Sequence, residues 1–192
     1  MGFAKKIAKN KIYKDDKKIK KKMRQEKMLE AKADQNIQIS YLAQNIRDTR
    51  QYMTTVEVLA NVFTACARAK FRFYKPAVEE LLKKVNSQMD CIKLGYISSA
   101  EIREILREEI ELDLDYEPQG EMTHERAISS RAVQDITAAF MLSLKDGWGY
   151  KKIRLSRWHS MAAKMVHSIQ SNQLTVEDVA LMAAGKKKFA YR

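Results

Sequence analysis

The residues with the clearest capacity for chemistry are the cations of residues 14–32, where lysine and arginine dominate. Such side chains neutralise phosphates and release counterions, which gives a salt-dependent affinity that is independent of base sequence. Residues 1–33 hold 13 basic and 4 acidic residues, a net charge of +9. The candidate contacts in this segment are Lys14, Lys17, Lys18, Lys20, Lys21, Lys22 and Arg24. A solubilising tail, or a helix that pairs with an acidic segment such as 101–125, would have the same composition.

A second group of cations lies beside aromatic residues near the start of a later expected helix, and its members are Lys151, Lys152, Arg154 and Arg157. Aromatic rings among cations can stack on bases while the cations contact phosphates. The aromatic residues here have apolar counterparts 77 residues earlier, which favours packing at a corner between two helices over base stacking. The residues of these two expected elbows are Phe71, Phe73, Trp148, Gly149 and Tyr150.

The sequence offers little support for catalysis or for a metal site. His159 and His167 lie eight residues apart, but no cysteine or acidic residue completes a set of metal ligands with them. Cys66 and Cys91 lie in apolar helical patterns without an activating histidine, so we expect them to be reduced and structural. We therefore expect no catalytic residue, no metal and no cofactor.

The elements that must position these cations are helices. The chain of 192 residues holds only two prolines and six glycines, and lysine, glutamate, alanine, methionine, isoleucine and leucine are abundant. No apolar run approaches the ~20 residues of a membrane span, and the N-terminus lacks the apolar region of a secretory signal. The sequence therefore predicts an all-α cytoplasmic protein.

Positions 77 residues apart resemble each other without a gap. The matched pairs include Val56 and Val133, Phe63 and Phe140, Phe71 and Trp148, Gly95 and Asn172, Ser98 and Thr175, and Glu101 and Asp178. Gly95 and Asn172 are residue types that close helices in the left-handed conformation. Ser98 and Thr175 can accept the free N–H groups that open the next helix. We interpret the pattern as an internal repeat; the alternative is the apolar periodicity that all helical proteins share.

The predicted architecture is an all-α helical bundle of two pseudo-repeated three-helix units, at an offset of 77, plus an N-terminal basic helix. The expected segments are a basic arm (1–33), a first unit (34–111), an acidic linker (112–122), a second unit (123–185) and a basic tail (186–192). Within the first unit, Thr54 and Glu57 form a capping-box pattern that predicts the start of a new helix.

The segment Gly147-Trp-Gly-Tyr-Lys-Lys-Ile-Arg-Leu155, followed by a helix and by Leu174-Thr-Val-Glu-Asp-Val179, resembles small helical proteins of bacteriophages that infect Gram-positive bacteria. The shared pattern is glycine–aromatic–glycine, basic residues, Arg-Leu, a helix, and then an apolar residue with threonine and acids. The first expected elbow lacks both glycines. The resemblance implies a phage origin and a bacterial host cytoplasm, and it transfers no catalytic residue.

These observations support two main hypotheses. In the first, the chain is a non-enzymatic phage regulatory or accessory protein that binds nucleic acid or a nucleoprotein through its basic helical faces. In the alternative, it is a protein–protein inhibitor of a host enzyme or defence complex. The helical bundle and the internal repeat alone would also suit a structural phage component.

Overall fold

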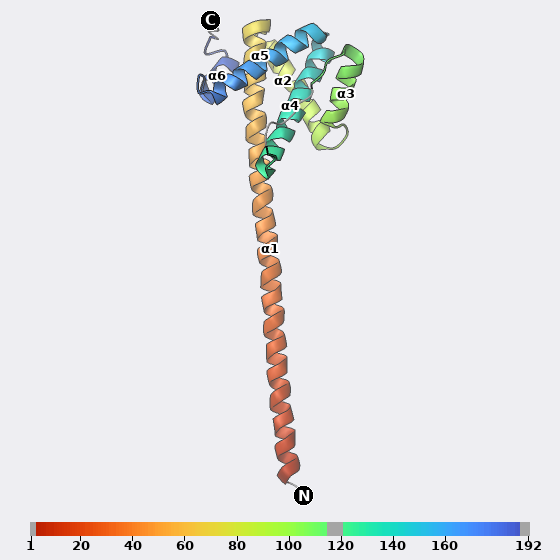
Figure 1. The fold of residues 1–192 in the computed structure, drawn as a ribbon, viewed down its shortest axis with the longest axis vertical. Helices are drawn as coiled ribbons and strands as arrows, with labels where there is room; N and C mark the ends of the chain where they lie inside the picture. Colours follow the sequence, from red (N-terminus) through yellow and green to blue (C-terminus); the bar gives the residue numbers. More distant parts are fainter. Residues whose placement is uncertain (1–2, 115–120, 189–192) are drawn as a thin grey trace. The chain divides into compact units, whose positions relative to one another are not determined.

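The computed structural model describes residues 3–114 and 121–188, and side chains from residue 20 onward except those of Lys21 and Glu26. Every regular element in those ranges is an α-helix (Figure 1), which confirms the all-α class. The helices are α1 (Phe3–Phe71), α2 (Lys75–Lys93), α3 (Ser99–Ile110), α4 (His124–Trp148), α5 (Lys152–Gln170) and α6 (Val176–Ala183). None of the helices in the described ranges is long and apolar enough to cross a membrane. Part of the expected acidic linker, 115–120, lies outside the described residues.

The chain divides into two compact units, Met1–Arg47 and Asp48–Arg192. The first unit is the N-terminal part of α1, and its described side chains are exposed except that of Ala43. Large apolar side chains such as Leu29 and Ile37, each 66% exposed, therefore lack burial within this unit. Intrinsic helix propensity and main-chain hydrogen bonds account for the helix here, because tertiary packing does not contribute to it.

The predicted helix start at Thr54 is wrong, because α1 continues through this position without a break. The Thr55 hydroxyl donates to the Gln51 carbonyl oxygen at 3.0 Å, which is the bond that a threonine makes inside a helix. A capping box needs a residue outside the helix before it, and the preceding sequence contains no proline or glycine that would interrupt the helix.

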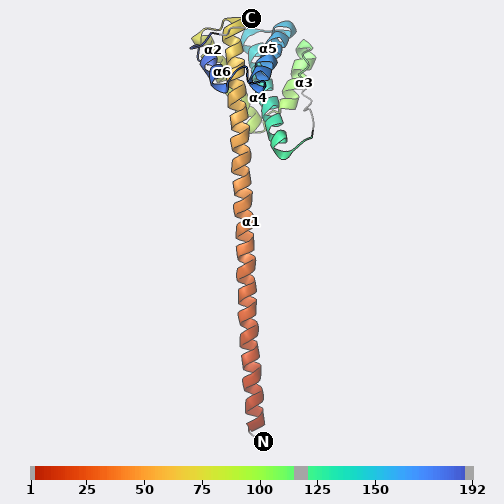
Figure 2. The same cartoon turned by 60° about the vertical axis from the view of Figure 1, so that its left-hand side comes forward.

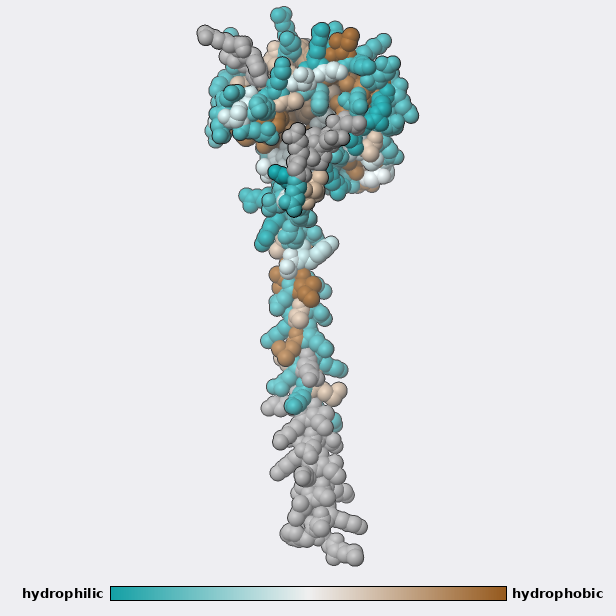
Figure 3. Space-filling model, viewed as in Figure 1, coloured by the Kyte–Doolittle hydropathy of each residue, from teal (hydrophilic) through white to brown (hydrophobic). Residues whose placement is uncertain are grey.

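The second unit has a buried core formed by the last turns of α1 and by the five following helices. Both views of the fold show α2 to α6 gathered around the end of α1 (Figures 1 and 2). The apolar face of α2 presents Val78, Leu81 and Val85, all buried, and α2 packs along α4. Helix α3 also packs on α4, through a stripe that includes Ile102 and Leu106. Hydrophilic residues cover most of the face of this unit seen in Figure 3.

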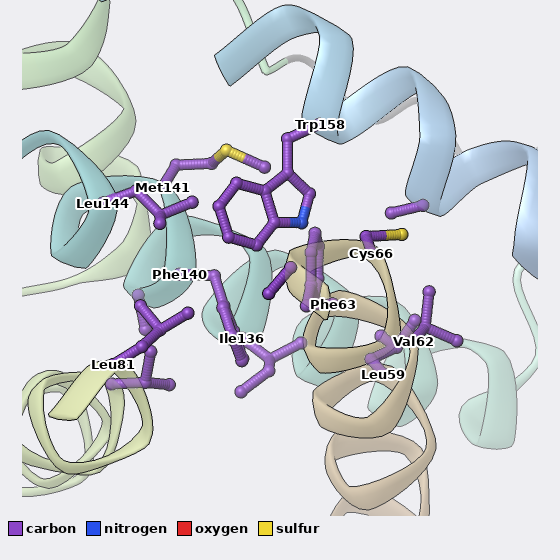
Figure 4. Close-up of a cluster of buried hydrophobic side chains, with 14 of the residues drawn as sticks. Leu59, Val62, Phe63, Cys66, Leu81, Ile136, Phe140, Met141, Leu144 and Trp158 are labelled. Atoms are coloured by element: carbon purple, nitrogen blue, oxygen red, sulfur yellow. The ribbon is translucent and has the colours of Figure 1, made fainter. Parts of the chain in front are cut away.

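Trp158 lies at the centre of this core and has no exposed surface. Figure 4 shows the indole pointing from α5 into the space between α4 and the end of α1, towards Phe63 and Phe140. The rings of Phe63 and Phe140 stack on each other, with centroids 4.8 Å apart and an angle of 22°. Phe71 stacks on Trp158 with a centroid distance of 4.7 Å. Aromatic stacking and burial therefore join α1, α4 and α5 at one point.

The predicted caps of the two short helices are confirmed. The Ser98 hydroxyl accepts from the Glu101 N–H, and the Glu101 carboxylate accepts from the Ser98 N–H. Thr175 and Asp178 form the same reciprocal pair at the start of α6. Each cap follows a left-handed residue, Gly95 at φ +75° or Asn172 at φ +56°, as the sequence predicts for a helix that must end and turn.

A polar network connects α1 to α4 where both helices enter the core. The Tyr52 hydroxyl donates to the buried carboxylate of Asp135 at 2.8 Å, and the guanidinium of Arg131 lies 3.7 Å from the same oxygen. Burial raises the pKa of Tyr52, and the hydrogen bond to Asp135 raises it further. The hydroxyl therefore remains protonated and serves as the donor that a buried carboxylate requires.

Replacement of Trp158 by alanine should lower the free energy of unfolding by about 3–5 kcal/mol, because it removes a fully buried ring and leaves a cavity. Ile153→Ala on the same helix is the matched control, since Ile153 is 68% exposed and should change stability by no more than about 0.5 kcal/mol. Urea denaturation followed by circular dichroism measures both values. Equal losses in the two variants would contradict the assignment of Trp158 as the centre of the core.

Candidate nucleic-acid interface

Cations from three parts of the second unit converge on one open groove of about 1120 Å³. The end of α1, one face of α5, and the last part of α6 with the residues after it form its walls. None of the lining residues is acidic, and the basic ones are Arg68, Lys70, Arg72, Arg157, Lys164, Lys187 and Lys188. A concave surface lined by one sign of charge focuses the electrostatic field and attracts polyanions.

Helical spacing explains why α5 presents its cations to the groove. Leu155, Trp158 and Met165 are buried and fix one face of α5 against the core. Arg157 and Lys164 lie seven residues apart, on a neighbouring face that lines the groove. The exposed hydroxyl-bearing residues Ser156 and Ser160 lie four residues apart on this same face. The helix therefore offers both charge and hydrogen-bond donors to a ligand.

The end of α1 supplies the opposite set of cations. Arg68 and Lys70 lie in its last turn, and Arg72 follows it with a left-handed backbone at φ +54°. The buried ring of Phe73 holds this corner against Trp148, at a centroid distance of 5.1 Å. The corner is thus anchored by an aromatic side chain while its basic neighbours face the groove.

The groove has an apolar floor below its basic rim. Ala65 and Met182 are buried, Met161 is half-buried, and each lines the groove. Phe73 also lines it, but only 8% of this residue is exposed. No free aromatic face is therefore available among the lining residues for a base to stack on, and phosphate contacts must supply most of the affinity for a nucleic acid.

The chain after α6 completes the groove by a sharp turn at Gly185, whose φ is +73°. A Cβ at this position would lie 3.0 Å from Nη1 of Arg68, so glycine leaves room for the guanidinium. Lys187 Nζ donates to Oδ1 of Asp178 at 2.6 Å, which ties the turn to the start of α6. This bond to Lys187 and the cap at Thr175 hold the pKa of Asp178 below its usual range. Lys187 is therefore the one groove cation with a charge partner among the described residues.

The cations predicted from the sequence occupy different places. Arg157 lines the groove, whereas Lys151, Lys152 and Arg154 are exposed outside its lining. Lys152 pairs with Glu111 at 3.1 Å, and the Arg154 guanidinium lies 5.0 Å from the ring centroid of Tyr150. In the first unit the predicted contacts Lys20, Lys22 and Arg24 are exposed, and the side chains of Lys14, Lys17, Lys18 and Lys21 lie outside the described residues.

Four cations of the groove were missed by the sequence analysis: Arg68, Lys70, Arg72 and Lys164. The alternation of basic and apolar residues in 68–73 was the available signal. It gave no reason to place this corner beside α5, which begins more than 75 residues later in the chain. Lys187 and Lys188 fall within the predicted basic tail, which the structure brings to the same groove.

The aromatic residues of both expected elbows pack against each other. Tyr150 is buried, Trp148 is half-buried, and Gly149 has the positive φ of +62° that ends α4. Phe71 contacts Tyr150 at 5.9 Å, and Phe73 contacts Trp148 at 5.1 Å, so each elbow packs on the other. These rings serve packing, and the neighbouring cations are left to make the contacts.

In the described part of the chain, no three His, Cys, Asp or Glu side chains come together as metal ligands would. Comparison of the chain with protein-family models, with curated proteins and with solved structures found no match. The case for a function therefore rests on the chemistry of the groove.

Gly185→Ala should lower the free energy of unfolding by about 1–2 kcal/mol, because alanine resists the left-handed backbone. Gly95→Ala is the control, since Gly95 has φ +75° and no atom within 4 Å of an added Cβ. Urea denaturation should give similar losses for both. Only Gly185→Ala should also shift the Arg68 Nε–H resonance in a nitrogen-15 NMR spectrum, and an unchanged resonance would contradict the close contact between Gly185 and Arg68.

Proposed function

We propose that the protein is a non-enzymatic nucleic-acid-binding protein that holds a phosphate backbone in the groove between α1, α5 and the segment after α6. The observation that carries this proposal is the concentration of seven cations, with no acidic residue, around one groove of about 1120 Å³. A protein surface usually mixes both signs of charge, so a long one-sign lining is typical of a site for a polyanion. Phosphates satisfy such a lining and release counterions as they bind.

The N-terminal basic helix supplies a second contact in this proposal. Lys20, Lys22 and Arg24 are exposed on the described part of the first unit, which carries no buried surface of its own to explain its conservation of charge along 1–33. Lysine-rich helices bind phosphates without reading base edges, which suits a phage regulatory or accessory protein that coats or bridges nucleic acid in the host cytoplasm.

We further propose that the second unit arose by duplication of a three-helix element. Helix α1 ends at Phe71 and α4 at Trp148, and α2 and α5 begin at Lys75 and Lys152, so each pair is offset by 77 residues. The capping boxes of α3 and α6 keep the same offset. In this interpretation, the charge of the groove was acquired by only one of the two copies, after the duplication.

The alternative function is inhibition of a host enzyme or defence complex. The apolar floor formed by Ala65, Met161 and Met182 under a basic rim favours it, because an amphipathic helix with acidic flanks would match such a surface. The two functions differ in their ligand. A nucleic acid should compete for the groove in one case, and an acidic helical peptide should displace it in the other.

Charge reversal in the groove should weaken binding of a single-stranded oligonucleotide. Arg157→Glu with Lys164→Glu removes two phosphate contacts, and the slope of log K against log salt should fall in magnitude by about 1.4. The control is Lys83→Glu with Lys93→Glu, which reverses two exposed lysines of α2 that do not line the groove. Fluorescence anisotropy at several salt concentrations measures both slopes. An affinity that stays constant across a fourfold range of salt would contradict the proposal.

Reversal in the N-terminal helix tests the second contact. Lys20→Glu, Lys21→Glu and Lys22→Glu together should weaken binding to oligonucleotides of every base sequence by a similar factor, because these lysines neutralise phosphates only. The same anisotropy titration with oligonucleotides of different composition measures this. A loss confined to one sequence would instead indicate base recognition, and no loss would show that the arm makes no contact.

A further inference from the structure

Arg68 is a cation without an anion in a place where the protein elsewhere supplies one. We infer that it anchors an anion subsite that holds a backbone phosphate of a single nucleic-acid strand. This inference rests on the proposed function and makes it more specific, because it names the anchoring residue and the form of the nucleic acid. Arg68 is half-buried, and its Nε is buried without a hydrogen-bond partner.

The position 77 residues later shows how such a cation is normally neutralised in this protein. Lys145, in the last turns of α4, forms an ion pair with Glu109 of α3 and a second one with Asp146 at 3.2 Å. Only 17% of its side chain is exposed, and the two carboxylates compensate this burial. Arg68 occupies the matching place near the end of α1, but no ion pair to it exists within residues 20–114 and 121–188.

The loss of both carboxylates has a visible structural cause. Asp146 corresponds to Ala69, which has no charge. Glu109 is carried to Lys145 by the last turn of α3, which runs to Ile110, whereas α6 already ends at Ala183. The chain then turns at Gly185, where an added Cβ would lie 3.0 Å from the Arg68 Nη1. The turn therefore brings backbone close to the guanidinium and brings no acid with it.

The surrounding groove indicates that the missing anion belongs to a polyanion. A single small anion would need one or two cations, but Arg157, Lys164 and Lys188 extend the positive lining beyond Arg68. Ser156 and Ser160 add hydroxyl donors on the same wall. A guanidinium offers a planar set of donors that matches two oxygens of one phosphate, and charge-assisted bonds of this kind are among the strongest in proteins.

The shape of the groove favours a single strand over a duplex. At about 1120 Å³ it is close to the size of small-molecule pockets, so a few nucleotides of an extended strand can enter it. Duplex DNA is convex and is read by elements that protrude into its grooves. A duplex would touch the exposed rim, at Lys70 and Arg157, and would leave the half-buried Arg68 without a phosphate.

The inference predicts a different effect of Arg68 on each ligand. Arg68→Gln in the full chain should weaken binding of a 12-nucleotide oligo-dT at least tenfold, because it removes a charge-assisted contact to phosphate. It should weaken binding of a 12-base-pair duplex less than twofold. Anisotropy titrations at one fixed salt concentration measure both ratios, and contributions of the N-terminal helix cancel because wild type and variant share it.

Lys145→Gln is the matched control, because it removes the cation of the position that the chain neutralises itself. This variant should lose thermal stability, since it leaves Glu109 and Asp146 without their partner, and it should keep its affinity for oligo-dT within twofold. Arg68→Gln should show the opposite pattern, with unchanged or higher thermal stability and lower affinity. Differential scanning fluorimetry provides the stability measurement.

The outcomes separate this inference from the proposed function. If Arg157→Glu with Lys164→Glu abolishes oligo-dT binding and Arg68→Gln does not change it, the groove binds nucleic acid and the Arg68 subsite is wrong. Equal losses for single strand and duplex on Arg68→Gln would overturn the preference for a single strand. If poly-glutamate displaces oligo-dT from the groove at lower concentration than unlabelled oligo-dT does, an acidic protein partner is indicated and the inference fails. Absence of binding to any oligonucleotide would overturn both proposals.

Discussion

The stack of Phe71 on Trp158 is the contact on which the second unit depends. It joins the last residue of α1 to the middle of α5, at a centroid distance of 4.7 Å, in a place from which water is excluded. Phe73 and Tyr150 surround the same indole at 5.8 and 6.4 Å. Each ring buries a large apolar area, and pairs of this kind add about 0.5–1.5 kcal/mol beyond that area. The helices are thus fixed at the corner, and the faces beside it are free to carry charge.

That division of labour explains how a basic groove can exist beside a well-packed core. Cations that face each other repel, and their repulsion would separate two helices held by weak contacts. Here the energy that holds α1 near α5 comes from the aromatic cluster, so Arg68, Arg157 and Lys164 need not contribute to folding. The same side chains are then available to a ligand that neutralises them. A site of this kind is stabilised by its ligand, as mass action requires for any ligand that binds the folded state alone.

Charge is handled differently on the opposite side of the unit. The cations near the end of α4 and the start of α5 meet carboxylates of the chain: Lys145 meets Glu109, and Lys152 meets Glu111. These exposed or partly exposed pairs contribute modestly to stability, at about 0–1 kcal/mol each. Their main consequence is that the acidic segment around α3 satisfies one set of cations and leaves the groove cations without a counterpart. Arg68 shows the contrast most clearly, because its Nε has no partner.

The sequence by itself determined the helical class, the caps at Ser98 and Thr175, and the ends at Gly95 and Asn172, because these depend on residues within a few positions of each other. It identified Arg157 as a contact and the elbow rings as packing residues on the same local grounds. Only the tertiary structure decided that α1 runs through Thr54, since helix continuity here follows from the absence of an interruption upstream and not from the capping pattern. Only the tertiary structure brought Arg68 and Lys164 to one groove, because the packing of Trp158 sets which faces of α1 and α5 meet, and that choice depends on residues nearly ninety positions apart.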